Sequence, residues 1–485
     1  MLLKNRELLN QFVLYFFILL FAGFATLGLC YENYLLAAIP FILLIVLLAF
    51  CALDKLLLLV AFFTPLSLPL AYFIAESDFD LHLPTEPILI GIVILFALKL
   101  LLGHRIDKKI LLHPVSLAID ANLVWIFITC CTSTMPLVSF KFLLSRLWFV
   151  IPFYFLGTQL FRKLKNIRRF FWCYIFTLLA TIIIITIHHA SHGFTQQAAN
   201  AVPYPFFNDH TAYGAIIAMF IPFILLNTSV KQSIFRRSFI SVIMLIVLVA
   251  LVLSYTRAAW ISIVIAILTG LAIHYKVKFK LIALGGLVCV FVFSFYWTDL
   301  LNRMESNRKV SSSDITQHIE SISNISNDPS NVERLNRWAS AFRMFKEKPI
   351  FGWGPGTYMF QYAPYQVSYE KTVISTNSGD MGNAHSEYIG PLTESGVLGT
   401  LTYLTVLITA IYTGIKVYSR SSRRAVKIFV LSVVLGLTTY AIHGFVNNFL
   451  DTDKASVPFW AFMAIIVALD VYFNPEKQAG KNQLT

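Results

Sequence analysis

The chain has 485 residues, of which 57% are hydrophobic and only 13% are charged. Soluble globular proteins carry about 25% charged residues, so a water-soluble fold of this composition would expose more apolar surface than such proteins tolerate. The 38 basic and 25 acidic residues give a net charge of +13. Membrane topology explains this charge without nucleic acid, because membrane proteins concentrate lysine and arginine on their cytoplasmic side.

Apolar runs of about 20 residues, the length that crosses a bilayer, recur along the whole chain. The first run follows Lys4 and Arg6 and is longer than a signal-peptide core, so we interpret it as a membrane helix. We predict about fourteen membrane-spanning helices and therefore an all-α polytopic membrane protein. The predicted spans are residues 11–29, 34–52, 56–75, 87–103, 114–134, 142–161, 169–187, 210–228, 238–254, 259–275, 281–297, 397–417, 426–446 and 456–473.

The charges of the loops indicate the orientation. Basic loops recur on one side of the predicted membrane, and the first substantial loop on the other side is acidic, with Glu76, Asp78 and Asp80. Lysine and arginine mark the cytoplasmic side, so both termini are predicted to be cytoplasmic. The chain is accordingly divided into N-terminal membrane helices (1–200), membrane helices that carry an arginine site (201–297), a large outer loop (298–396), and C-terminal membrane helices with a cytoplasmic tail (397–485).

The outer loop is the only segment large enough to form a subdomain. After a Ser/Asn-rich stretch at 311–331, apolar residues recur at helical spacing and predict an amphipathic helix over 331–345. Residues 349–356 then read PIFGWGPG, which is typical of a tight turn. The apolar positions of the predicted helix are Leu335, Trp338, Ala341, Phe342 and Phe345.

Cysteines and clustered histidines give no sign of a crosslink or a metal centre. The six cysteines lie in or beside apolar runs without CxxC spacing, so we expect small core residues rather than disulfides. His188, His189 and His192 are poorly spaced for one tetrahedral ion and have no acidic or cysteine ligand close by in the sequence. We therefore predict no metal site, and we expect His192 and the nearby polar residues to line a cleft for substrate.

Four charged residues are predicted at or near the outer ends of membrane helices: Lys141, Arg146, Arg257 and Lys454. Charges within a membrane are expensive and are usually retained for function. For Lys141 the simpler interpretation is a side chain that extends to the interface.

Several segments, in a fixed order, resemble the O-antigen ligase superfamily, which includes O-antigen polymerases and protein O-oligosaccharyltransferases. They are SYTRAAW at 254–260, RLNRW at 334–338, PIFGWGPG at 349–356, and HSEY at 385–388 with ESG at 394–396. The resemblance implies a GT-C-like membrane fold with a partly helical periplasmic loop. It also implies transfer of a glycan from an undecaprenyl-diphosphate carrier at the outer face of the bacterial inner membrane, without a metal or other cofactor. The implied acceptor is a lipid A–core sugar in ligases and a second lipid-linked glycan in polymerases.

The predicted catalytic residues are His385, Arg257 and Arg334. A departing lipid diphosphate needs fixed cations in a poorly solvated site, and arginine binds phosphate oxygens bidentately. His385 matches the histidine of the superfamily and would take the proton of the attacking hydroxyl. The simpler interpretations are an interfacial anchor for Arg257, a surface charge paired with Glu333 for Arg334, and a hydrogen-bonded loop residue for His385.

Further residues are predicted to bind substrate: Arg146, Arg337, Glu387, Glu394 and Asn383. Arg337 competes with Arg334 for the diphosphate, and Arg146 binds it or braces two helices. Glu387 and Glu394 orient the imidazole or bind sugar hydroxyls, with a place at a helix N-terminus the alternative for Glu394.

Two other interpretations stay open at this point. Asp209 and His210, which open the span at 210–228, favour a helix cap, with contact to an acceptor sugar the alternative. A transporter of the same lipid is the competing function. Transporters often show two similar halves with broken helices at the midplane, whereas this sequence has no visible repeat and its candidate residues gather at one face.

Overall fold

The computed structural model describes residues 2–31, 35–73, 81–103, 106–228, 232–277, 329–368, 371, 375 and 382–473. The predicted span at 281–297 and most of the Ser/Asn-rich stretch lie outside these residues. Within the described ranges, nine helices are long and apolar enough to cross a membrane. The prediction of an all-α polytopic membrane protein is confirmed.

The nine helices agree with predicted spans to within a few residues at most ends. They are α6 (Pro114–Cys131), α7 (Pro136–Val150) continued through a π-helical turn into α8 (Gly157–Leu160), α9 (Leu164–Ser191), α11 (His210–Thr228), α12 (Ile234–Leu253), α13 (Arg257–His274), α18 (Gly396–Arg420), α19 (Arg424–His443) and α20 (Asp453–Phe473). Short helices α5 (Lys108–Leu111) and α10 (Gln196–Ala199) lie in the connections.

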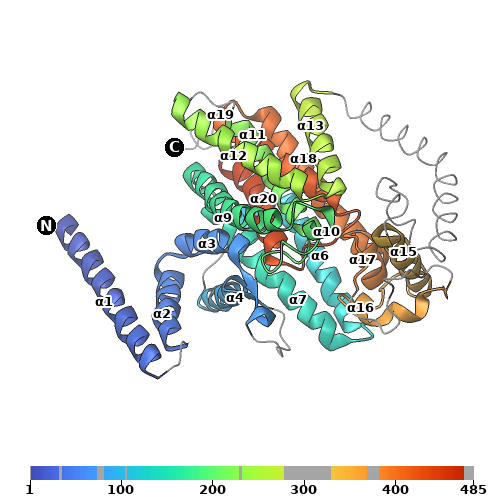
Figure 1. The fold of residues 1–485 in the computed structure, drawn as a ribbon, viewed down its shortest axis with the longest axis horizontal. Coiled ribbons are helices and arrows are strands. Elements are labelled where there is room, and N and C mark those ends of the chain that lie inside the picture. The colour runs from blue at the N-terminus through green and yellow to red at the C-terminus, as the bar shows by residue number, and fades with distance from the viewer. Residues whose placement is uncertain are drawn as a thin grey trace.

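The N-terminal part differs from the prediction at one place. Helices α1 (Leu2–Cys30), α2 (Leu35–Cys51) and α4 (Thr85–Leu101) follow predicted spans, and Figure 1 shows α1 and α2 at the edge of the molecule. The continuous span predicted at 56–75 is wrong, because α3 (Leu53–Phe63) ends in 3₁₀ turns. Pro65 and Pro69 lack the N–H groups that a longer helix would use. Between these turns, β1 (Leu68–Pro69) pairs antiparallel with β2 (His82–Leu83).

The centre of the bundle consists of α11, α19 and α20. In α11 and in α20, 78% of the residues in the most apolar stretch of 18 are buried, because other helices surround both. Aromatic side chains fill the contact with α9: the rings of Phe171 and Phe223 stack at 3.9 Å, and those of Tyr174 and Phe220 at 4.3 Å. This rigid centre holds the connection between α19 and α20, residues 444–452, at the end of the bundle that carries the outer loop.

The outer loop forms a small helical lid at one end of the bundle, where Figure 1 shows α15, α16 and α17 together. The predicted amphipathic helix is confirmed as α15 (Pro329–Glu347). Ala341 and Met344 of α15 pack with Tyr358 of α16 (Tyr358–Gln361) and with Tyr362 in a separate small core. Phe342, predicted on the apolar face, is instead exposed. Helix α17 (Ile389–Glu394) leads from the lid into α18.

Candidate functional site

The segment that precedes α17 carries His385 in an uncommon conformation. Its φ of +47° lies in the left-handed region, which few residues other than glycine adopt and which is often found at functional sites. The Asn383 side chain stabilises this bend, because its Oδ1 accepts a hydrogen bond from the His385 backbone N–H at 3.0 Å.

Charges on α15 and at the start of α11 act on the His385 imidazole. Burial lowers its pKa to about 4, and the positive charges of Arg337 and Arg334 lower it as well. Asp209 and Glu333 act in the opposite direction and raise the pKa. The imidazole is therefore neutral at pH 7, and a ring nitrogen can accept a proton.

The two arginines of α15 differ in their contacts. Arg337 is buried and braces the lid: its Nε lies 3.0 Å from Glu333 Oε1, and its Nη1 donates to the Asn383 carbonyl at 3.1 Å. Its guanidinium also covers the Tyr362 ring at 5.4 Å. The half-buried Arg334 extends toward the α19–α20 connection, where its Nη2 lies 3.4 Å from Asn447 Oδ1. Arg337 therefore braces the lid, whereas Arg334 contacts the connection between α19 and α20.

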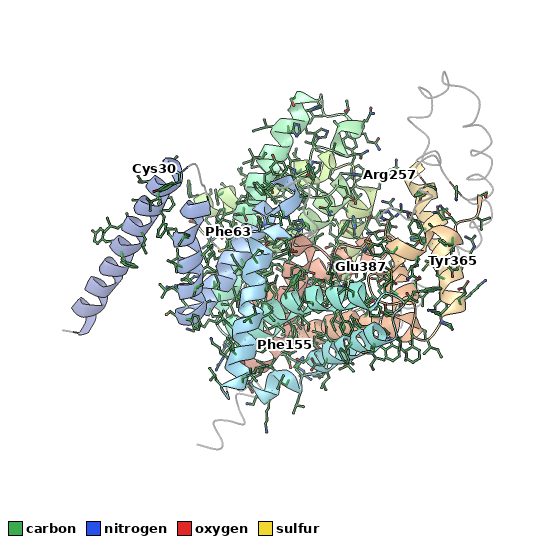
Figure 2. All side chains as sticks on the ribbon, turned by 90° about the horizontal axis from the view of Figure 1, so that it is seen from below. Cys30, Phe63, Phe155, Arg257, Tyr365 and Glu387 are labelled. Carbon is green, nitrogen blue, oxygen red and sulfur yellow. The ribbon has the colours of Figure 1, made fainter. Side chains whose placement is uncertain are left out.

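Arg257 is the first residue of α13, and its side chain is exposed. The preceding residue ties this helix start to α11, because the Thr256 hydroxyl donates to the His210 carbonyl at 2.9 Å. His210 follows Asp209, whose charge acts on His385. Figure 2 shows Arg257 and Glu387 toward the side of the molecule that carries the lid. Arg257 makes no ion pair with another residue in the part of the chain that the structure describes.

Glu387 anchors the His385 segment to the bundle. Its buried Oε1 accepts hydrogen bonds from the Tyr440 hydroxyl at 2.5 Å and from the N–H groups of Phe449 at 2.8 Å and Leu450 at 3.0 Å. Burial raises the pKa of Glu387, and the nearby Asp451 raises it further. The carboxyl group therefore positions the segment through the α19–α20 connection, and its hydrogen bonds do not go to the imidazole.

Glu394, at the end of α17, accepts hydrogen bonds from the turn at 349–356 and from the residues that follow it. Its Oε1 accepts from the Tyr358 N–H at 3.0 Å, and its carbonyl accepts from the Gly354 N–H at 2.8 Å. Gly354 has φ +117°, and a Cβ there would lie 1.9 Å from Ser133 Oγ, so no other residue fits. Burial raises the pKa of Glu394 to about 7. The predicted tight turn is thus present, and it docks the lid on α17 and on the connection between α6 and α7.

A cavity of about 670 Å³ is lined by residues on both sides of His385 in the sequence, among them Ala384 and Ser386. Apolar residues of α4 and α7 contribute to its lining. The lining residues that carry polar side chains include Lys141, Arg146, Asn383, Ser386, Glu387, Glu394, Asn448 and Asp451. Arg146 Nη2 lies 3.5 Å from Asp451 Oδ1, so this arginine bridges α7 and the α19–α20 connection as well as lining the cavity.

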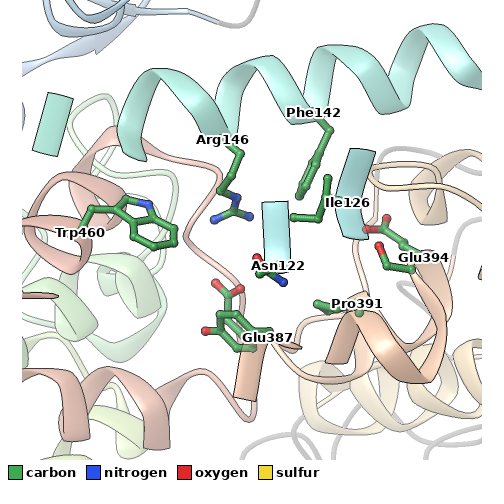
Figure 3. Close-up of a pocket in the computed structure, with 11 residues that line it drawn as sticks. Asn122, Ile126, Phe142, Arg146, Glu387, Pro391, Glu394 and Trp460 are labelled. Atoms are coloured by element: carbon green, nitrogen blue, oxygen red, sulfur yellow. The ribbon is translucent and has the colours of Figure 1, made fainter. Parts of the chain in front are cut away.

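A smaller chamber of about 40 Å³ shares Arg146, Glu387 and Glu394 with the cavity. Figure 3 shows Arg146 and Glu387 pointing toward each other across it. Tyr403 and Trp460 also line this chamber. The Tyr403 hydroxyl and Trp460 Nε1 are buried and have no hydrogen-bond partner among the described residues, whereas buried polar groups normally have one.

The structure divides the predicted residues into two groups. His385, Arg334 and Arg337 lie together, while Arg146, Asn383, Glu387 and Glu394 line the cavity. Arg257 stands apart at the start of α13. Lys454, which we predicted near an outer helix end, is buried and pairs with Asp453 at 3.2 Å.

The sequence analysis did not predict that Asp209 acts on the pKa of His385 or that Tyr403 and Trp460 line the smaller chamber. The predicted helix cap at Asp209 is present, with its Oδ1 accepting from the Ala212 N–H at 2.7 Å. The only signal for a second role was its position at the outer face. Nothing in the sequence distinguishes Tyr403 and Trp460 from other membrane aromatics. Across the ranges that the structure describes, no three His, Cys, Asp or Glu side chains gather as metal ligands.

Comparison with protein families gives one match: the model of the O-antigen ligase family matches residues 242–404. The matched stretch contains Arg257, Arg334, Arg337 and His385 and covers the lid. It supports the resemblance to the O-antigen ligase and polymerase superfamily and indicates a membrane glycosyltransferase of ligase or polymerase type. A comparison with curated protein sequences gives no match.

Proposed function

We propose that this chain, whose residues 242–404 match the model of the O-antigen ligase family, moves a glycan from an undecaprenyl-diphosphate carrier to a sugar hydroxyl of lipid A–core. The observation that carries the proposal is His385, held by Asn383 in a left-handed bend at the end of a membrane bundle, with the positive charge of Arg334 acting on its imidazole. The reaction takes place at the periplasmic face of the bacterial inner membrane, with both termini in the cytoplasm.

In the proposed step, the acceptor hydroxyl attacks the anomeric carbon of the donor sugar. A new carbon–oxygen bond forms there, and the bond from the same carbon to the phosphate oxygen breaks, with its electron pair leaving on the diphosphate. His385 takes the hydroxyl proton. A single displacement inverts the configuration. Arg257 and Arg334 supply the positive charge that stabilises the leaving group, so the proposal needs no metal.

Donor binding would also activate the base. Arg334 lowers the pKa of His385 in the free protein, and a diphosphate bound to this arginine brings compensating negative charge. The pKa of the imidazole then rises toward its ordinary value, and a histidine near pKa 6.5 is a better general base than one near 4.

The acceptor sugar is assigned to the cavity. Carboxyl groups outnumber cations along its lining, with Glu86, Glu387, Glu394 and Asp451 against Lys141 and Arg146. Such a lining is unsuited to a diphosphate and suits neutral hydroxyl groups, which both donate and accept hydrogen bonds. Asn383, Arg146, Glu387 and Glu394 are the proposed contacts, and the buried Arg337 would act by holding Asn383.

The test uses purified protein in lipid nanodiscs, a lipid-diphosphate oligosaccharide, and either lipid A–core or no second substrate. Transfer to lipid A–core that is lost in His385→Ala and in Arg257→Ala supports the proposal. The exposed His274→Ala, at the opposite end of α13 from Arg257, is the matched control and should remain active. Longer lipid-linked chains without lipid A–core would identify a polymerase instead. No glycosidic product with either acceptor, from authenticated substrates, would favour the transporter.

A further inference from the structure

The turn between α15 and α16 carries apolar side chains on the outside of the molecule. Ile350 is 55% exposed and Phe351 43%, and the neighbouring Val397 and Leu398 at the start of α18 are 39% and 40% exposed. The Pro349 carbonyl accepts a hydrogen bond from the Val397 N–H at 2.9 Å, so these four residues are neighbours. We call Ile350, Phe351, Val397 and Leu398 the tip patch.

The depth of the tip patch follows from its contacts with two membrane helices. The Phe351 ring stacks on Trp125 of α6 at 5.7 Å, with 14° between the ring planes. Trp125 precedes the end of α6 by six residues, or about 9 Å of helix. Its indole N–H donates to the Ser395 carbonyl at 2.8 Å, directly before α18. The turn therefore lies level with the start of α18, and closer to the middle of the membrane than the end of α6.

The side chains around the tip patch are those of a membrane interface. Lys348 lies two residues before Ile350, with its Nζ 4.2 Å from the Trp353 ring centre. Tryptophan concentrates at the membrane interface, and a lysine near a helix end extends its charged group to the same depth.

From this geometry we infer that the tip patch inserts into the outer leaflet and anchors the lid to the phospholipid surface. The occupant is lipid, because the patch continues the lipid-facing surfaces of α6 and α18. Anchoring would hold α15, with Arg334 and Arg337, at a fixed height above the bilayer. The inference rests on the exposure and contacts of the turn and does not depend on the proposed reaction.

Photocrosslinking tests the anchor directly. The photoreactive residue p-benzoylphenylalanine replaces Ile350, and the full chain is irradiated in nanodiscs of phosphatidylethanolamine and phosphatidylglycerol. Mass spectrometry then measures phospholipid adducts. Replacement of the exposed Lys346 is the matched control on the same lid, and replacement of Leu401, on the surface of α18, is the positive control. We expect at least about fivefold more adduct at position 350 than at 346. Equal yields at the two positions would overturn the inference.

A second measurement does not rely on the probe. Ile350→Asp opposes insertion, because it places a charge in the interface. Hydrogen–deuterium exchange of residues 346–356 should then rise at least about fivefold, while the helix α19 keeps its protection and confirms folding. Unchanged exchange over 346–356 in the folded variant would contradict an anchor.

Discussion

Two replacements of Glu387 distinguish the effect of its hydrogen bonds, which position the His385 segment, from the effect of its negative charge. Its Oε1 accepts three hydrogen bonds, from Tyr440, Phe449 and Leu450, and these join the His385 segment to the α19–α20 connection. Glu387→Ala removes the acceptor and leaves all three donors behind. Glu387→Gln keeps a carbonyl oxygen in the same place and matches the shape of a protonated carboxyl group, the form that burial favours.

The expected magnitudes follow from the donors left without a partner. Each buried donor that loses its acceptor destabilises the fold by about 1–3 kcal/mol. Water in the adjoining chamber can replace part of the loss for Glu387→Ala, so we expect its free energy of unfolding to fall by about 3 kcal/mol or more. For Glu387→Gln we expect a decrease of about 1 kcal/mol or less.

The assay is unfolding of the solubilised protein by SDS titration, followed by circular dichroism, together with glycan transfer at saturating donor. Lys346→Ala, an exposed charged residue on α15, is the control and should unfold like the original protein. Transfer should fall strongly in Glu387→Ala and survive in Glu387→Gln. Equal stability of the Ala and Gln variants would refute the anchoring role. An inactive but stable Gln variant would instead show that the charge matters.

Four further outcomes are expected. The pH profile of transfer is measured in a Glu394→Gln background, which removes a carboxyl group with a pKa of about 7. On acidification kcat/KM should stay flat until the pH approaches about 4, because the pKa of His385 in the free protein is about 4, whereas kcat should begin to fall at a higher pH, because the bound donor raises this pKa. A fall of kcat/KM near about pH 6.5 would contradict the lowered pKa. His385→Asn should abolish transfer with a stability loss below about 1 kcal/mol, because asparagine tolerates positive φ, whereas His385→Ala also strains the backbone by about 1–2 kcal/mol; thermal unfolding compares the two. Arg334→Lys should lower kcat/KM by about 10- to 100-fold through loss of bidentate phosphate contacts, while Arg343→Lys on the same helix has little effect in the same assay. Gly354→Ala should destabilise the fold by at least about 1–3 kcal/mol, whereas Gly91→Ala, where a Cβ meets nothing within 4 Å, should not; SDS unfolding measures both.

The membrane helices were predictable because their signal is local. A run of apolar residues between polar ends defines a span wherever it lies, and α11 begins and ends at the predicted residues. The amphipathic spacing of α15 was equally local. The error at 56–75 arose where apolar composition continued through two prolines that prevent helical hydrogen bonding. Hydropathy alone does not register that loss.

The site was predictable only in part, because its contacts join residues that are distant in sequence. Motif resemblance pointed to His385 and the arginines as candidates, but no pattern separates Arg334 from Arg337 until Glu333 and Asn383 are seen to hold the second. The role of Glu387 depends on partners 53 to 63 residues further along the chain. Such pairings arise from packing, which a single sequence does not record.

His385 has a positive φ, and the residues that flank it in the sequence line the cavity. Asn383, Ala384, Ser386 and Glu387 all line the cavity, whereas the charges that lower the pKa of the His385 ring come from Arg334 and Arg337. An inverting displacement needs the attacking hydroxyl and the leaving phosphate on opposite faces of the anomeric carbon. The His385 segment meets that need if the acceptor occupies the carboxyl-rich cavity and the diphosphate binds the arginines. The left-handed bend would then set the direction of attack, and straightening it would misplace the base even with every charged group retained.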